Sequence, residues 1–294
     1  EAPEIPMTSR TPLAASLALA TALLAGCGES AAPAADAPTA DAASTPVPPV
    51  AEKRDHAVVA PHGASRNDEY YWLRDDSRSA PDVLAYLEAE NAYADAMLAD
   101  IAPLTDTLYQ EIVGRIQQDD SSVPYSDGGW MYYTRYAEGQ EYPIHARRQG
   151  SMDAPEQVML DVNQLAAGQG FFAVGNWEVS EDGNLLAWAE DTSGRRQYTL
   201  KVKDLRTGEV LADTITGASG SLVWANDGLS FFYVENDPVT LLSTRVKQHV
   251  LGTDPATDPV VYEEADTSFY MGLGRTTDDT HLCIGVSSTV SSEQ

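Results

Sequence analysis

The sequence repeats one short pattern, an aspartate-containing turn followed at once by apolar and aromatic residues. The pattern occurs at Asp127, Asp182 and Asp227, and in a weaker form at Asp278, so that successive copies lie 55, 45 and 51 residues apart. Short apolar segments bounded by Asp-Gly and Thr-Gly turns are typical of antiparallel strands. A recurrence of roughly 50 residues is the length of one propeller blade, four strands with their turns. A β-sandwich has similar turns but no such recurrence, which favours a propeller.

We therefore expect an all-β fold in which residues 124–294 form an incomplete β-propeller. Four copies of the pattern correspond to about three to four blades, and the segment from Ile284 to Ser292 is expected to be a strand cut short within the fourth. Closed rings need more blades. This portion is accordingly expected to be truncated.

Helical spacing replaces the strand pattern before residue 123. From Pro81 to Asp100 apolar residues lie three and four apart, and proline suits a first helical turn. After a break expected at Pro103, a second apolar stripe repeats every four residues: Leu104, Leu108, Ile112 and Ile116. We expect residues 55–123 to form an N-terminal α-helical arm. Its stripe is too wide for the two helices to cover by packing only on each other.

The beginning of the chain has the features of an export signal. After Met7, the single charge of Arg10 precedes a mostly apolar run from Leu13 to Leu24, which is too short to span a bilayer. The run ends in Leu-Ala-Gly-Cys, which resembles the bacterial lipobox, whose cysteine is acylated and becomes the new N-terminus. We expect residues 1–26 to be a lipoprotein signal peptide with Met7 as the true start and Cys27 as the lipid attachment site. An ordinary cleaved signal with a chance cysteine is the alternative.

Residues 27–54 are rich in Ala, Pro, Ser and Thr. Because they contain few large apolar side chains, burial of these side chains cannot offset the conformational entropy lost on folding. We expect a disordered tether with a root-mean-square span of roughly 25–30 Å. The expected location is that of an exported bacterial lipoprotein on the periplasmic side. Gly28 in place of Asp resembles outer-membrane lipoproteins and favours that membrane.

The balance of charge narrows the range of partners. Asp and Glu number 45 against 18 Lys and Arg, for a formal net charge of −27. Such a chain repels nucleic acid and anionic membrane surfaces, so membrane contact is expected through the lipid anchor only. The charge either attracts a cationic substrate or simply keeps the protein soluble. Cys27 and Cys283 are the two cysteines, too few for a disulfide framework or a four-cysteine zinc site.

The motifs of common active sites are missing from these 294 residues. The nucleophile elbow Gly-x-Ser-x-Gly is absent, Ser219 coming nearest with Gly217 before it but Ser221 after it. The five histidines have no metal-ligand spacing, and Gly272-Leu273-Gly274 lacks the third glycine of a dinucleotide fingerprint. We expect no catalytic residue, no metal and no cofactor. Four acid pairs could form cation-binding rims, although acids at turns are usually solvated: Asp75-Asp76, Asp119-Asp120, Glu263-Glu264 and Asp278-Asp279.

Six segments, in the same order, resemble the oligopeptidase B branch of the prolyl oligopeptidase family of serine peptidases. The resemblance covers about residues 51 to 294. Its segments are Tyr70-Tyr71-Trp72-Leu73-Arg74-Asp75, Glu141-Tyr142-Pro143-Ile144 leading to Arg147-Arg148, Gly194-Arg195-Arg196-Gln197-Tyr198, Trp224-Ala225-Asn226-Asp227, Asp237-Pro238-Val239-Thr240-Leu241-Leu242, and Leu251-Gly252-Thr253-Asp254-Pro255.

The resemblance implies a seven-bladed propeller that caps a C-terminal α/β-hydrolase domain and excludes large proteins from its active site. Members of this branch cut short basic peptides after Arg or Lys, and their catalytic residues belong to the hydrolase domain. The partners expected are therefore short basic peptides and that domain, and this chain is expected to be inactive alone. Two other classes stay open: a lipid-anchored propeller that binds a peptide or polysaccharide without catalysis, and a structural envelope protein.

Overall fold

The computed structural model describes residues 45–294, which divide into two compact units, one ending at Thr105 and the other beginning at Asp106. The expected signal peptide, Cys27 and most of the expected tether lie outside the described residues. No helix within 45–294 is both long and apolar enough to cross a bilayer.

The first unit holds a small hairpin and a long helix. Strand β1 (Ala57–Val59) pairs with β2 (Ser65–Asn67), and the 3₁₀ turn η1 (Tyr71–Leu73) leads to helix α1 (Pro81–Leu98). Asp75 accepts hydrogen bonds from the backbone N–H groups of Ala80 and Ser79 at 2.7 and 2.6 Å. Together with the Ser77 hydroxyl, these bonds lower the pKa of Asp75 to about 2. This acid therefore organises the turn before α1 and is not a free cation-binding group.

The turn between the two helices lies slightly earlier than the sequence suggested. A 3₁₀ turn, η2 (Ala99–Ile101), separates α1 from α2 (Ala102–Gly114), and Pro103 is the second residue of α2. Proline fits there because the first turn of a helix needs no backbone N–H donors. The apolar stripe from Leu104 to Ile116 is exposed, so the partner that covers it stays a prediction.

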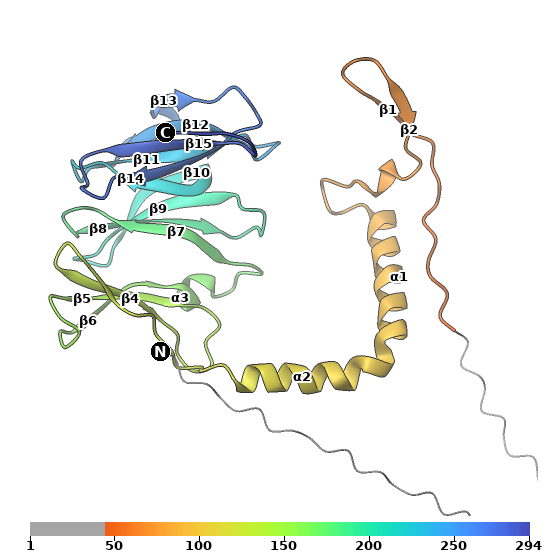
Figure 1. Ribbon diagram of the computed structural model, residues 1–294, viewed down its shortest axis with the longest axis horizontal. Coiled ribbons are helices and arrows are strands. Elements are labelled where there is room, and N and C mark those ends of the chain that lie inside the picture. Colours follow the sequence, from red (N-terminus) through yellow and green to blue (C-terminus); the bar gives the residue numbers. More distant parts are fainter. Residues whose placement is uncertain (1–44) are drawn as a thin grey trace, which may run out of the picture. The chain divides into compact units, whose positions relative to one another are not determined.

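Antiparallel strands make up most of the second unit (Figure 1). The first four pair in sequence order and are followed by a short helix: β3 (Tyr125–Asp127), β4 (Trp130–Arg135), β5 (Ile144–Gln149), β6 (Glu156–Asp161) and α3 (Val162–Ala166). A seven-stranded sheet follows: β7 (Ala173–Val179), β8 (Leu185–Asp191), β9 (Tyr198–Asp204), β10 (Val210–Trp224), β11 (Ser230–Asn236), β12 (Ser243–Val250) and β13 (Val260–Glu263). The 3₁₀ turn η3 (Pro255–Thr257) precedes β13, and the last sheet holds β14 (Tyr270–Arg275), β15 (Leu282–Ser287) and β16 (Ser292–Glu293).

The 15-residue strand β10 explains why one sheet has seven strands. Its first part pairs with β9 and its last part with β11, and Ala218 is a partner of both Tyr198 and Glu235 at the change of register. The strands therefore form four groups: β3–β6, β7–β9 with the first part of β10, the last part of β10 with β11–β13, and β14–β16. Grouping by four is the organisation of propeller blades.

The repeated aspartates occupy equivalent positions in these groups. Asp127 ends β3, and the other three lie in the turns β7–β8, β10–β11 and β14–β15, so each marks the turn between the first and second strand of its group. Asp182 accepts from the Ser180 hydroxyl at 2.6 Å and from the Asn184 backbone N–H at 3.0 Å, which holds the turn closed. The expected hairpins are thus present, while the number of blades in a closed ring stays a prediction.

One strand expectation was wrong. The residues from Ile284 to Ser292 do not form a single strand, because β15 ends at Ser287. The Ser288 backbone N–H donates to the Ser291 carbonyl at 2.8 Å, and this turn folds the chain back so that β16 pairs with β15. A run of serines with one threonine favours such side-chain and backbone turns over extended structure.

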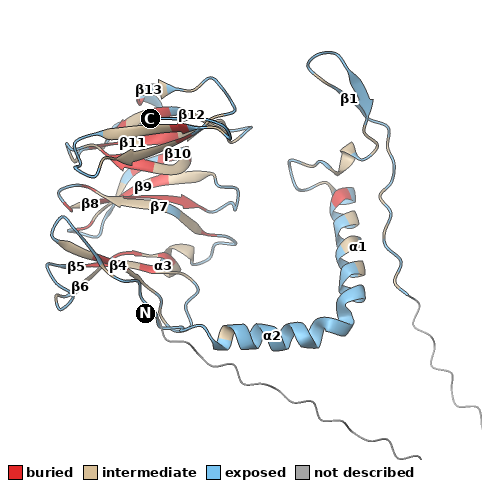
Figure 2. Ribbon diagram, viewed as in Figure 1, coloured by how far each residue is buried: buried red, intermediate tan, exposed pale blue. Residues whose placement is uncertain are grey.

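The buried residues of the second unit lie mostly on its strands (Figure 2), and apolar clusters join successive groups. One cluster joins Met159 and Leu160 of β6 to Leu186 and Trp188 of β8. Two further clusters lie between the second and third groups and between the third and fourth. Strand β8 contributes alternate side chains to clusters on both of its faces, which explains its nearly continuous apolar sequence.

Close packing of Tyr198 depends on glycine. The ring of Tyr198, a residue of one family-like segment, lies against Gly175 of β7 and Gly220 of β10. A Cβ on Gly175 would overlap the edge of that ring. The glycine therefore leaves the space that Tyr198 occupies.

A buried polar network lies between β10 and η3. His249, which is fully buried, hydrogen-bonds Asp258 through Nδ1 and Asp213 through Nε2, each at 3.0 Å. Asp213 also accepts from the Gly252 backbone N–H at 2.5 Å, and the Tyr233 hydroxyl donates to Asp258 at 3.1 Å. Another family-like segment, which contains Gly252, thus serves to anchor the network.

Candidate ligand-binding cavity

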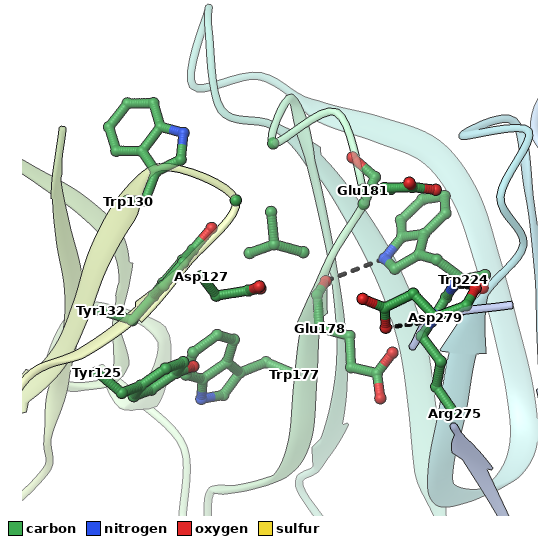
Figure 3. A pocket seen from close by; sticks show the side chains of 14 residues that line it. Tyr125, Asp127, Trp130, Tyr132, Trp177, Glu178, Glu181, Trp224, Arg275 and Asp279 are labelled. Atoms are coloured by element: carbon green, nitrogen blue, oxygen red, sulfur yellow. Dashed lines mark hydrogen bonds and ion pairs between the residues drawn. The ribbon is translucent and has the colours of Figure 1, made fainter. Parts of the chain in front are cut away.

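A cavity of about 530 Å³ lies in the second unit, beside the turns that carry the repeated aspartates. Residues of all four strand groups line it, from β3 and β4, from β7 and the turn after it, from the end of β10, and from the end of β14 and the turn after it (Figure 3). The hairpins that the sequence repeat predicts are therefore the elements that position its side chains.

Aromatic rings form much of the wall. Tyr125 stacks on Tyr132 with ring centroids 5.4 Å apart, and Trp177 lies 6.3 Å from Tyr132. The Arg147 guanidinium lies 3.8 Å from the ring centroid of Trp130. Tyr125 is 53% exposed, so part of this side chain stays accessible at the cavity.

Four carboxyl groups line the same cavity. Figure 3 shows Asp127 on one side and Glu178, Glu181 and Asp279 on the other. Arg275 is the basic residue of the lining. Its guanidinium donates to the backbone carbonyls of Trp224 and Asp279 and to the side chain of Asn226, so most of its hydrogen-bonding capacity is already used.

Glu178 has the most perturbed environment of these acids. Burial raises its pKa to about 7, against a hydrogen bond from the backbone of Trp224 and the charge of Arg275, which lower it. The Trp224 indole N–H donates to the backbone carbonyl of Glu178 at 3.0 Å and holds this part of β7 in place. A carboxyl with this pKa changes its charge near neutral pH and is a candidate functional group.

Of the candidate residues singled out in the sequence, Asp279 of the last acid pair lines the cavity, whereas several others lie elsewhere and have structural roles. Ser219 belongs to β10, where its hydroxyl accepts from the Ser221 backbone N–H at 3.1 Å. His56 stacks on Tyr71 at 3.9 Å, and His145 hydrogen-bonds Thr134 at 3.0 Å. Asp278, of the last acid pair, accepts from the hydroxyls of its own turn.

Sequence reasoning missed Glu178, Glu181 and Arg275. The available signal was an ionisable residue between Trp177 and Val179 at the end of a predicted strand, directly before a repeat turn. That signal is weak because acids at strand ends are common. The cavity gathers residues from Tyr125 to Asp279, and their proximity depends on how the strand groups pack.

Comparison with known proteins places the fold among peptidases. The family model described as "Prolyl oligopeptidase, N-terminal beta-propeller domain" matches residues 49–294. Dipeptidyl aminopeptidase BI of Pseudoxanthomonas mexicana is 55% identical over 270 residues, covering 87% of this chain and 37% of that protein. Protease 2 of Moraxella lacunata is 32% identical over 252 residues, covering 83% and 36%.

Solved structures of this family resemble the chain in fold as well as in sequence. Oligopeptidase B from Leishmania major has a TM-score of 0.76 at 35% identity, covering 82% of this chain and 36% of that one. Oligopeptidase B from Trypanosoma brucei, solved in a closed form with covalently bound antipain, has a TM-score of 0.74 at 33% identity over the same shares. The chain thus spans a little over a third of the length of these proteins.

Proposed function

Because this chain belongs to the prolyl oligopeptidase family, as its N-terminal β-propeller domain, we propose that it is the substrate-gating portion of a serine oligopeptidase. The observation that carries the proposal is the similarity to oligopeptidase B from Leishmania major, in sequence and in fold together. A propeller set over an active site admits only peptides that fit past it. It selects substrates and leaves the chemical barrier unchanged.

In the proposed full-length protein the reaction is peptide hydrolysis by acyl transfer. A serine activated by histidine attacks the peptide carbonyl, and backbone N–H groups stabilise the oxyanion. The 294 residues contain no Gly-x-Ser-x-Gly elbow, so these groups would come from an α/β-hydrolase domain. This chain contributes the entrance and the acid-lined cavity.

For the substrate we propose short peptides cut after Arg or Lys. The net charge of −27 and the four carboxyl groups of the cavity both favour basic peptides. The similarity to a dipeptidyl aminopeptidase, at 55% identity, favours a second candidate, release of dipeptides from the amino end.

One experiment separates these readings. The gene is sequenced past Gln294, and its whole product is assayed on peptides with Arg, Lys or Ala before the cleaved bond, each with a free or an acetylated amino end. Cleavage after Arg in both forms supports the oligopeptidase. A requirement for the free amino end supports the dipeptidyl aminopeptidase. A reading frame that ends without an elbow serine would favour the binding module without catalysis.

For location we propose a lipoprotein anchored through Cys27 on the periplasmic side of the outer membrane. The order of Arg10, an apolar run and Leu-Ala-Gly-Cys supports it, and two or more acyl chains anchor stably where one does not. Mass spectrometry of the membrane fraction should find an acylated N-terminal Cys27 peptide. An unmodified internal Cys27 peptide in exported protein would contradict the proposal.

A further inference from the structure

We propose that the cavity is a subsite for one positively charged group of a peptide, an ammonium or a guanidinium, held between the carboxylates of Glu178 and Glu181 and the aromatic wall of Tyr125 and Trp177. That the ligand is a peptide rests on the proposed function. That it is a cation rests on the lining of the cavity alone.

The charge of the lining is unbalanced. Asp127, Glu178, Glu181 and Asp279 oppose a single guanidinium, that of Arg275, which lies 3.8 Å from the Asp279 carboxylate. Within residues 45–294, Asp127, Glu178 and Glu181 make no ion pair of their own. A cation that enters would meet carboxylates in a partly desolvated space, where charge interactions are stronger than in water.

The aromatic wall favours the same class of ligand. A cation within about 6 Å of an aromatic centroid is attracted by the ring face. The protein already uses this contact, most closely with Arg147 3.8 Å from the centroid of Trp130 and Arg54 4.1 Å from that of Trp72. Tyr125 and Trp177 offer comparable rings beside the unpaired carboxyl groups.

Glu178 couples binding to pH. Burial favours its neutral form, and an incoming cation would favour its charged form, so binding should release a proton near pH 7. The other titratable or charged groups of the lining are Asp127, Glu181, Arg275, Asp279, Tyr125 and Tyr132. Cation affinity should accordingly rise as pH increases from 6 to 8.

The test uses the full chain at low micromolar concentration and four small probes. N-acetylarginine amide carries only a guanidinium, and N-acetylcitrulline amide has nearly the same shape without charge. Alanylalanine amide carries only an ammonium, and its N-acetyl form is neutral. Tryptophan fluorescence reports binding, since three of the five tryptophans line the cavity, and calorimetry gives the dissociation constant.

We expect at least one charged probe to bind about tenfold more tightly than its neutral analogue. Preference for the arginine probe would identify the source as a basic side chain, and preference for the alanylalanine probe would identify it as a peptide amino end. Equal binding of charged and neutral probes, or no binding at millimolar concentration, would overturn the proposal.

Substitutions test whether the charged probe binds in this cavity. Glu181→Gln and Glu178→Gln should each weaken the charged probe about fivefold to tenfold at pH 8, and Glu178→Gln should also remove the rise in affinity between pH 6 and 8. Glu138→Gln is the control, since Glu138 is exposed and outside the cavity lining. Equal losses in all three variants would contradict the assignment.

This outcome is independent of the peptidase assay. Probe binding to the chain without hydrolysis by the whole gene product would support the cavity and refute the proposed function. Hydrolysis after Arg with no probe binding would do the reverse.

Discussion

At the scale of single residues, His249 shows how one buried side chain joins parts of the second unit. Both of its ring nitrogens lie 3.0 Å from carboxylate oxygens, so the ring bridges two buried acids. Asp213 belongs to β10 and Asp258 follows η3, so the network connects the strand shared by two groups to the loop before β13. A single histidine in β12 (Ser243–Val250) does not reveal such partners in sequence.

We expect His249→Ala to lower the free energy of unfolding by about 3–5 kcal/mol, because it leaves two buried carboxylates without a hydrogen-bond partner that they share. Urea denaturation at pH 7 measures the change. His281→Ala is the matched control, since His281 is exposed, and should change stability by less than about 0.5 kcal/mol. Equal effects of the two substitutions would show that the network contributes little.

Glu178 gives a second prediction at this scale. Its folded pKa of about 7 is above the ordinary 4.5, so the neutral carboxyl favours the fold. That contribution is fully present below about pH 4.5 and is lost as pH rises through 7. Glu178→Gln should therefore match the unmodified protein at pH 5 and exceed it at pH 8, by on the order of 2 kcal/mol. Thermal unfolding at both pH values checks this, and a pH-independent difference would contradict the assigned pKa.

At the scale of elements, turn chemistry was predictable and strand pairing only partly so. Four aspartates mark hairpins, and the side chains of Asp182, Asp227 and Asp278 accept hydrogen bonds from backbone N–H groups of their own turns, an effect contained within a few residues. The continuity of β10 was not predictable, since it depends on Ala218 pairing with strands on both sides. The helix break was predicted at Pro103 but lies at Ala99–Ile101. A proline can mark the end of one helix or stand in the first turn of the next, and the sequence alone does not distinguish the two.

Gly175→Ala tests packing between elements. Its added Cβ would overlap the Tyr198 ring, and overpacking of this kind typically costs about 1–3 kcal/mol. Gly272→Ala, in β14 with no atom within 4 Å of the added Cβ, should have a much smaller effect. Denaturant midpoints compare the two. The double variant Gly175→Ala with Tyr198→Ala should cost less than the sum of its parts, and strict additivity would exclude the clash.

At the scale of the whole molecule, the family was predictable from six short segments while the cavity was not. Some of those segments have local structural roles, such as the segment around Gly252, whose backbone N–H donates to Asp213. Roles of this kind depend on a few neighbouring residues and can therefore be recognised in the sequence. The cavity combines Tyr125, Glu178 and Arg275, which belong to three different sheets, so their proximity depends on the order in which these sheets pack. Short sequence patterns do not predict how these sheets pack.

We expect the chain by itself not to hydrolyse an arginine-containing test peptide, because positioning of a nucleophile and its base supplies most of the rate of acyl transfer. A fluorogenic assay on protein purified to constant background measures this. The whole gene product serves as the positive control. Turnover that co-purifies with the chain through several columns would show that the proposed division between gate and catalytic domain is mistaken.

The strand β10 has one further consequence, for how the second unit comes apart. Since β10 closes one group and opens the next, neither group has an intact sheet without it, and its loss would expose an edge on both sides. Opening of β7–β9 and of β11–β13 is thereby linked, whereas the sheets on either side share no strand with them and can open separately. The middle of this domain should behave as a double-length cooperative unit between smaller ones, so that flexibility concentrates at its two flanks.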